Sequence, residues 1–300
     1  MTEFIHVNTR WSQRLRRDQQ PSPAELREHL LTVHRHHAGF TESCAGSCRD
    51  AHGRNSYEWL LEVVDPSRHR QVLDLACGSG ALTALCRQRF GQRVALIGVD
   101  MSTEELALAR QRVPEPDVKL HHGMAQDMGF IGEGSIDVVL CHWGLTLMDP
   151  IEPVLAEVRR VLHPGGIVAA IVDGEPNSAS GYDELNDLVY GWVQREYPGY
   201  GTVDIGDARV RKAAALAALM EAWFHGAEVR IEPAVVSLDA PPDMLAREAA
   251  GFFYASFVLS PSARRQMLRE IAALLAGQGV DGQGRFSMPI NRLVVSQPLR

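Results

Sequence analysis

The chain has 300 residues, 45% of them hydrophobic and 22% charged, which is the balance of a folded globular protein with a sizeable core. Its formal net charge of -7 argues against a dedicated nucleic-acid surface, because proteins that bind phosphate backbones usually carry a basic excess. No apolar run approaches the ~20 residues of a membrane span and no secretory signal opens the chain, so no membrane span is expected.

Residues 1–68 are expected to form a polar, helical N-terminal cap. Pro21 and Pro23 open a stretch with helical spacing that runs from 24 to about 37. A second helix is predicted over 56–64, because Pro66 disfavours helical backbone just before it.

From residue 71 onward, short apolar runs alternate with amphipathic stretches. The runs 72–76, 94–99, 118–121, 136–141 and 167–172 are predicted strands, and the stretches 82–90, 103–112 and 151–162 are predicted helices. Ser102 with Glu105 predicts a capping box, and Asp149 before Pro150 predicts the N-cap of the third helix. This alternation predicts an α/β fold with a doubly wound, mostly parallel sheet, whose core spans 69–174.

The alternation of predicted strands and helices is interrupted after residue 174. Residues 175–206 are interpreted as an insertion that forms a lid over the ligand site. The rest of the core is expected over 207–300, with a helix over 210–224, a strand near 229–238, a helical insertion over 242–277 and a last strand at 292–295. The last strand is expected to pair with the one before it.

A glycine-containing turn follows the first predicted strand, in the sequence Asp74-Leu-Ala-Cys-Gly-Ser-Gly80. Gly78 and Gly80 permit a tight turn and let a ligand lie against the backbone. A dinucleotide fingerprint would need a third glycine where this chain has Thr83. Asp74 stands before the glycines, where a carboxylate suits an amine or cation better than a pyrophosphate.

The second predicted strand ends in Asp100, whose carboxylate can accept both hydroxyls of a ribose. Taken singly, Asp74 and Asp100 are equally well explained as residues that form turns at strand ends. Their joint placement around the glycines favours a ligand with a ribose and a positively charged arm without phosphate. Such a ligand is a sulfonium nucleoside rather than NAD.

Residues 71–172 resemble the core of the class I S-adenosylmethionine (SAM)-dependent methyltransferases, in particular the small-molecule branch of the ubiquinone/menaquinone-biosynthesis type. The resemblance implies a seven-stranded Rossmann-like sheet, S-adenosyl-L-methionine as cofactor and S-adenosyl-L-homocysteine as product. It also implies that Asp74, Gly78 and Gly80 hold the methionine end of the cofactor, that Asp100 binds its ribose and that Met101 contacts the adenine.

Residues 121–130 resemble this family's Gly-Asp-Ala-x-x-Leu-Pro-Phe turn, with Met124 in place of the aspartate. The resemblance then implies adenine contacts from Met124, Ala125 and Gln126. Ala76 stands where the family often has glycine, and it is included among the cofactor-binding residues.

Methyl transfer needs a base only if the acceptor must lose a proton. His142 follows the fourth predicted strand and is a candidate base, with the alternative that it only packs against the methionine arm of the cofactor. His37, or its neighbour His36, is a second candidate to reach the substrate from the cap. If the cap folds as in relatives, Arg54 and Tyr57 contact the cofactor carboxylate.

A metal site is not expected. Cys44, Cys48 and His52 are spaced by four, but Gly46 and Gly53 weaken a helix there and no second ligand pair follows. Five cysteines do not make a disulfide scaffold, so a reducing cytoplasm is the expected compartment.

The expected activity is methylation of a small molecule, either a secondary metabolite or an aromatic or quinone-like compound, at oxygen rather than nitrogen or carbon. Aromatic residues of the two insertions favour such an acceptor: Tyr182, Tyr190, Trp192, Tyr197, Tyr200, Phe252, Phe253, Tyr254 and Phe257. One alternative is an RNA or protein methyltransferase, opposed by the acidic charge and by His142-Trp143-Gly144 in place of an Asn/Asp-Pro-Pro-Tyr/Phe motif. The other is a binding protein that keeps the cofactor without methylating. No nucleic-acid partner is expected, and the sequence does not indicate an oligomeric state.

Overall fold

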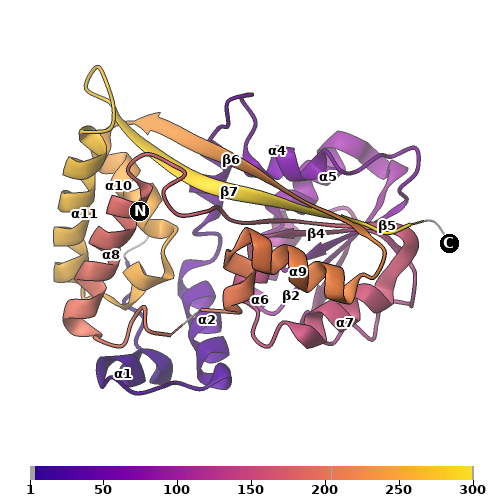
Figure 1. The fold of residues 1–300 in the computed structure, drawn as a ribbon, viewed down its shortest axis with the longest axis horizontal. Helices are drawn as coiled ribbons and strands as arrows, with labels where there is room; N and C mark the ends of the chain where they lie inside the picture. The colour runs from indigo at the N-terminus through magenta and orange to yellow at the C-terminus, as the bar shows by residue number, and fades with distance from the viewer. Residues whose placement is uncertain (1–3, 204, 299–300) are drawn as a thin grey trace. The chain divides into compact units, whose positions relative to one another are not determined.

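Seven strands form one sheet in the order β3-β2-β1-β4-β5-β7-β6 in the computed structural model, which describes residues 4–203 and 205–298 (Figure 1). The strands are β1 (Gln71–Leu75), β2 (Ala95–Asp100), β3 (Lys119–His122), β4 (Ile136–His142), β5 (Leu162–Asp173), β6 (Glu228–Ala240) and β7 (Gly284–Ser296). Strands β1 to β5 pair in parallel, and β7 runs antiparallel to β5. The predicted α/β class, with a mostly parallel seven-stranded sheet, is confirmed.

Helices occupy most of the remaining chain. They are α1 (Arg10–Arg16), α2 (Pro23–His37), α3 (Glu42–Ser47), α4 (Ser56–Leu61), α5 (Ala81–Phe90), α6 (Thr103–Arg112), α7 (Glu152–Val161), α8 (Tyr182–Glu196), α9 (Ala213–Trp223), α10 (Pro242–Gly251) and α11 (Pro261–Ala276). Short 3-10 turns are η1 (Gly91–Arg93), η2 (Gly144–Leu147), η3 (Ala208–Arg211) and η4 (Tyr254–Val258). None of the helices in the described part of the chain has the length and apolar character needed to span a bilayer.

The chain forms two compact units, each built from three segments. The first, which we call the helical unit, contains Met1–Asn55, Pro176–Asp204 and Val235–Pro289. The second, the sheet unit, contains Ser56–Glu175, Ile205–Ala234 and Ile290–Arg300. Strands β6 and β7 each contribute residues to both units. Helix α4, which begins at Ser56, is part of the sheet unit.

Helices cover both faces of the sheet unit, with α4 and α5 on one face and α7 and α9 on the other (Figure 1). The reason is visible in α7, where Val154, Leu155, Val158 and Val161 fall on one side at helical spacing and are all buried. They join a core with apolar residues of β1, β4, β5, β7 and α9. Each such side chain contributes roughly 1.5–3 kcal/mol through removal from water, so this face anchors the strands that carry the site.

Two predicted helix starts have different outcomes. Ser102 caps α6, with its hydroxyl accepting from the Glu105 N–H at 3.2 Å, while the Ser102 N–H donates to Asp100 Oδ1 instead of completing a capping box. The N-cap predicted at Asp149 is wrong, because α7 begins at Glu152 after Ile151. Pro153 takes the first turn, where its missing N–H costs no hydrogen bond.

Two further predictions need correction. The strand predicted over 167–172 begins five residues earlier, because β5 starts at Leu162, with a register shift against β4. A Cβ on Gly166 would lie 2.9 Å from Asp137 O, so a side chain would not fit this irregular strand start. The single helix predicted over 210–224 is divided into η3 and α9 by Lys212, whose backbone is extended.

Candidate functional site

Three residues of the turn after β1 have left-handed backbone: Ala76 (φ 57°), Gly78 (φ 51°) and Gly80 (φ 77°). Gly80 is required for space as well, because a Cβ there would lie 2.9 Å from the Cβ of Ala109 on α6. The glycine therefore brings the start of α5 directly against α6. This conformation exposes backbone N–H groups at a helix N-terminus, beside the carboxyl ends of β1 and β2.

Asp100, the last residue of β2, is bound to that turn. Its Oδ2 accepts from the Gly78 N–H and its Oδ1 from the Ser102 N–H, both at 2.8 Å. A carboxylate can accept several hydrogen bonds, hydroxyl donors included. The two backbone bonds fix the direction of the carboxylate, which is the geometry needed to select a vicinal diol.

Asp74 is buried at the end of β1 and accepts a hydrogen bond of 2.6 Å from the Thr83 hydroxyl. Burial, opposed by the Thr83 hydrogen bond and helped by the nearby charge of Asp100, raises the pKa of this carboxyl to about 7. A cation placed against it would draw the carboxyl to its charged form. Thr83, which occupies the position of the missing third glycine, is a site residue that the motif comparison overlooked.

The loop after β3 lies beside the end of β2. The Gly123 N–H donates to Asp100 O at 3.0 Å, and His122 Nε2 is 3.0 Å from Met101 O. Beyond Gly123, the half-buried residues of this loop include the three adenine contacts predicted in it: Met124, Ala125 and Gln126. The structure thus brings the predicted ribose and adenine residues to one edge of the sheet.

His142 ends β4 and is enclosed by the first turn of α4. Its Nε2 lies 2.8 Å from Ser56 Oγ, and its ring stacks on Tyr57 at 3.7 Å with an interplanar angle of 18°. Burial lowers the pKa of this imidazole to about 3. His142 therefore stays neutral at physiological pH, and a base with so low a pKa removes protons weakly. Tyr57, predicted to contact the cofactor carboxylate, packs against this ring.

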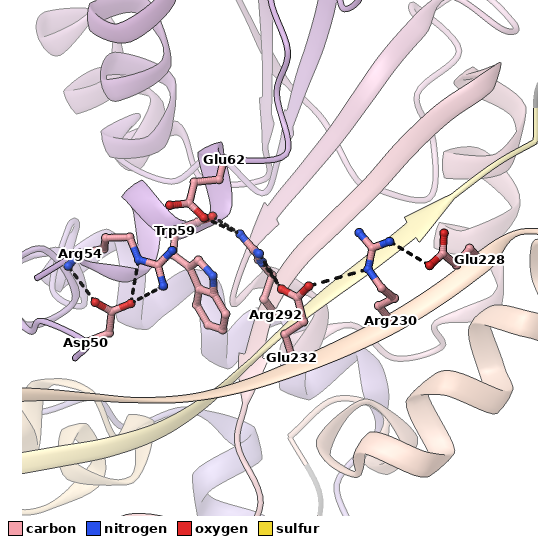
Figure 2. A network of polar contacts seen from close by, with 8 residues as sticks. All are labelled: Asp50, Arg54, Trp59, Glu62, Glu228, Arg230, Glu232 and Arg292. Carbon is pink, nitrogen blue, oxygen red and sulfur yellow. Dashed lines mark hydrogen bonds and ion pairs between the residues drawn. The ribbon is translucent and has the colours of Figure 1, made fainter. Parts of the chain in front are cut away.

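A ladder of charged side chains holds α4 to the outer strands of the sheet unit (Figure 2). Arg292 of β7 donates to Trp59 O at 2.6 Å, and its guanidinium lies 4.7 Å from the centroid of the Trp59 ring. The same guanidinium reaches Glu232 of β6 at 2.6 Å and Glu62 at 3.3 Å. Helix α4 also carries Ser56 and Tyr57, which contact His142, so these ion pairs help to hold both residues against the imidazole.

Arg54 lies in the helical unit, where it forms an ion pair of 2.7 Å with Asp50 (Figure 2). His37 also belongs to the helical unit; its Nε2 lies 2.7 Å from Ile5 O and its ring packs 4.6 Å from Phe257. Burial lowers the pKa of His37 as well. Neither side chain is part of the sheet unit that carries the turn after β1.

The cysteine residues are all buried and free. Cys44 and Cys48 have their sulfur atoms 3.8 Å apart, whereas His52 is exposed in a turn. Among the residues that the structure describes, no three metal-ligating side chains converge. Burial raises the pKa of the Cys77 thiol in the glycine turn, which keeps it protonated and suits a packing role.

Comparisons with known proteins agree with this geometry. A family model described as a methyltransferase domain matches residues 72–166, from β1 into β5. A demethylmenaquinone methyltransferase of Listeria welshimeri is 30% identical over 168 residues, which cover 47% of this chain and 71% of the relative. One from Symbiobacterium thermophilum is 34% identical over 128 residues, covering 40% and 51%.

Solved structures support the fold alone. Phosphoethanolamine N-methyltransferase 2 of Haemonchus contortus, in complex with phosphomonomethylethanolamine and S-adenosylhomocysteine, has a TM-score of 0.55 at 16% identity, covering 93% of this chain and 61% of that one. The YcgJ protein of Bacillus subtilis has a TM-score of 0.53 at 16% identity, covering 81% and 98%. From its sheet order, its strand-end acids and its 30% identity across most of a demethylmenaquinone methyltransferase, the chain belongs to the class I SAM-dependent methyltransferases of the small-molecule type.

Proposed function

We propose that this enzyme binds S-adenosyl-L-methionine and methylates an aromatic or quinone-like small molecule, with oxygen as the first choice of acceptor atom. The observation that carries the cofactor part is the placement of two carboxyl groups around one left-handed turn: Asp74 at the end of β1 and Asp100 at the end of β2. When bound, the sulfonium supplies an activated methyl group.

The residues at this edge fit such a cofactor in three ways. Within residues 4–203 and 205–298, no cationic side chain lowers the raised pKa of the buried Asp74 carboxyl, and the ammonium of a methionine arm would provide such a partner. Asp100 has a fixed carboxylate for the ribose hydroxyls. Met101 and the half-buried residues 124–126 offer apolar and backbone contacts to the adenine.

The acceptor atom follows from the chemistry of His142. Methyl transfer is an in-line displacement, so the protein acts mainly by aligning the two reactants and excluding water. His142 is retained as the candidate proton acceptor at this edge, but its pKa of about 3 makes it a weak base. This favours an acidic hydroxyl, such as a phenol or enol, over an aliphatic alcohol. His37, with its aromatic neighbours in the helical unit, is retained as a candidate substrate contact.

Two further observations support an aromatic acceptor, and a third supports a reducing compartment. Relatives that match 47% and 40% of this chain are named for demethylmenaquinone, which is itself a quinone. The expected cap and the helical insertion expected over 242–277 share an aromatic cluster formed by Phe4, Phe40, Tyr254 and Phe257 within the helical unit. The five free cysteines suit a reducing cytoplasm.

The experiment is a transfer assay with [methyl-¹⁴C]SAM and 2-naphthol, catechol, 1,4-naphthohydroquinone and bulk tRNA, each product being located by mass spectrometry. We expect label on the oxygen of a phenolic acceptor and none on tRNA. Asp100→Asn should weaken SAM binding, whereas Asp117→Asn, which alters only a surface ion pair with Arg87, should not. SAM binding without any methyl transfer would refute the enzymatic proposal, and label on tRNA would refute the acceptor class.

A further inference from the structure

The connection from β3 to β4, residues 123–135, contains the three expected adenine contacts at 124–126. None of these described residues belongs to a helix or a strand. The Asp127 N–H donates to Met124 O at 3.0 Å and closes a turn, but a turn by itself does not fix the segment to the sheet. The backbone of such a connection needs partners from other elements, because ordering it costs conformational entropy.

Helix α7 supplies these partners through the side chains of Glu157 and Arg160. Glu157 Oε2 accepts from the Met128 N–H at 2.8 Å, and Arg160 Nη2 donates to Met128 O at 2.9 Å. Arg160 Nη1 donates to Ile131 O at 2.9 Å, and the Arg160 carbonyl accepts from the Gly134 N–H at 2.9 Å. Both backbone polar groups of Met128 are therefore bound by side chains from one turn of a helix.

The two side chains also bind each other. Arg160 donates to both carboxylate oxygens of Glu157, from Nε at 2.7 Å and from Nη2 at 2.8 Å, which is the bidentate geometry that gives an ion pair a fixed direction. The hydrogen bond from Arg160 lowers the pKa of Glu157, against the effect of its partial burial, so the carboxylate is charged at neutral pH. A lysine would supply the charge without the planar fork that reaches Glu157 and two carbonyls together. We call this pair of residues the α7 clamp.

The α7 clamp acts at one end of the expected adenine contacts, through Met128. At their other end, the Gly123 N–H donates to Asp100 O at 3.0 Å. Residues 124–127 therefore lie between two backbone attachments, one to the last residue of β2 and one to α7. A segment held at both ends is close to its bound conformation before a ligand arrives, so less entropy is lost on binding.

We propose that the α7 clamp sets the base selectivity of the cofactor site, with Glu157 and Arg160 as positioning residues that act on the adenine contacts through Met128. The inference rests on the proposed function, because the adenine contacts at 124–126 belong to that proposal. Backbone N–H and C=O groups distinguish one base from another only when they are held within hydrogen-bond distance of it. A loosened clamp should therefore weaken recognition of the base more than binding of the rest of the ligand.

The test compares the affinities of S-adenosyl-L-homocysteine and S-inosyl-L-homocysteine in titration calorimetry. The second probe has an oxygen in place of the adenine amino group and a proton on the ring nitrogen next to it, and is otherwise the same. Wild type should bind the adenine probe about tenfold more tightly, the effect of one mismatched hydrogen bond. Arg160→Gln should reduce this preference to about twofold or less, mainly by weakening the adenine probe.

Two further variants make the comparison specific. Arg159→Gln removes an exposed arginine from the same last turn of α7 and should keep the wild-type preference. Arg160→Lys keeps the charge beside Glu157 and should give an intermediate preference of about three- to fivefold. It is the milder change, so it carries the comparison if Arg160→Gln does not fold.

Hydrogen exchange followed by mass spectrometry gives a readout that is independent of the ligand probes. Without ligand, the amides of 124–131 in Arg160→Gln should exchange roughly tenfold faster than in wild type, because their attachment to α7 is lost. The amides of β1 and β4 should exchange at the wild-type rate.

The inference is overturned if wild type shows no preference between the two probes, or if Arg160→Gln weakens both by the same factor, which is the result expected of a purely structural role. It is also overturned if Arg159→Gln loses the preference as fully as Arg160→Gln. Wild type that binds neither probe would refute the cofactor part of the proposed function as well. The other outcomes, obtained with a wild type that binds both probes, refute the positioning role alone.

Discussion

Asp74 should make cofactor binding depend on pH. Its pKa is raised to about 7 by burial and by the charge of Asp100, so below pH 7 the carboxyl holds a proton that an incoming ammonium group must displace. We expect the affinity for S-adenosylhomocysteine, whose amino acid arm is that of SAM, to rise about tenfold per pH unit up to pH ~7 and to level off above it. His142 does not contribute in this range, since its pKa is lowered to about 3.

The same shift affects stability. The carboxyl has an ordinary pKa of 3.8 in the unfolded chain and about 7 in the folded one, so the folded state binds more protons between these values. The free energy of unfolding therefore falls as the pH rises from about 4 to 7, by at most about 4 kcal/mol at 1.36 kcal/mol per pH unit. Asp74→Asn removes this penalty, so at pH 8 the variant should be more stable than wild type while binding the cofactor 10- to 100-fold more weakly.

Titration calorimetry between pH 5.5 and 8.5, in buffers of different ionisation enthalpy, measures both the affinity and the number of protons released. Urea unfolding at pH 5 and pH 8 gives the stability of wild type and Asp74→Asn. Thr83→Val is the matched variant, because losing the hydrogen bond that opposes the shift should move the inflection to higher pH. An affinity without pH dependence or proton release, or an equal pH dependence in Asp74→Asn, would refute the reasoning.

Replacing Arg292 by Gln should lower the free energy of unfolding, measured in urea, by about 2–3 kcal/mol, which is less than for a fully buried ion pair because the partner glutamates are 35% exposed. Arg292→Lys should lose only about half as much, and equal losses in the two variants would contradict this account. Gly144→Ala should lower the free energy of unfolding by about 1–3 kcal/mol, because the new Cβ would lie 2.7 Å from the Ala76 Cβ and 2.8 Å from Cys141 Sγ. Adding Ala76→Gly removes the first of these contacts and should recover part of the lost thermal midpoint; no recovery would contradict this account. The pH dependence of kcat from 5.5 to 9 should keep its shape in His142→Gln, because an imidazole with a pKa of about 3 does not titrate there; a lost inflection would count against the burial of that ring.

The alternation of apolar and amphipathic stretches predicted the strands and helices of the sheet, because it depends on residues close together in the sequence. Helix α6 matches its predicted bounds, and β1 to β4 lie within one residue of theirs. Parallel strands bring their carboxyl ends to one edge, so the convergence of Asp74 and Asp100 could be expected from sequence alone.

Other features depend on residues far apart in the chain, which no local pattern relates. Asp173 meets Arg211 across 38 positions, and Arg292 meets Trp59 across 233. Strands β6 and β7 are longer than predicted, because their ends carry polar residues that periodicity assigns to loops. The burial that gives His142 its low pKa comes from α4, whose place on the sheet is set by such distant contacts.

The division of both units into three segments has a consequence for synthesis on the ribosome. The sheet unit takes its last strand from residues 290–296, after the segment of the helical unit that ends at 289 has been made. Until then, β5 is paired only with β4 and presents an open edge of backbone N–H and C=O groups to neighbouring nascent chains. A stop codon or slow translation shortly before residue 290 should therefore yield aggregation rather than a smaller folded enzyme.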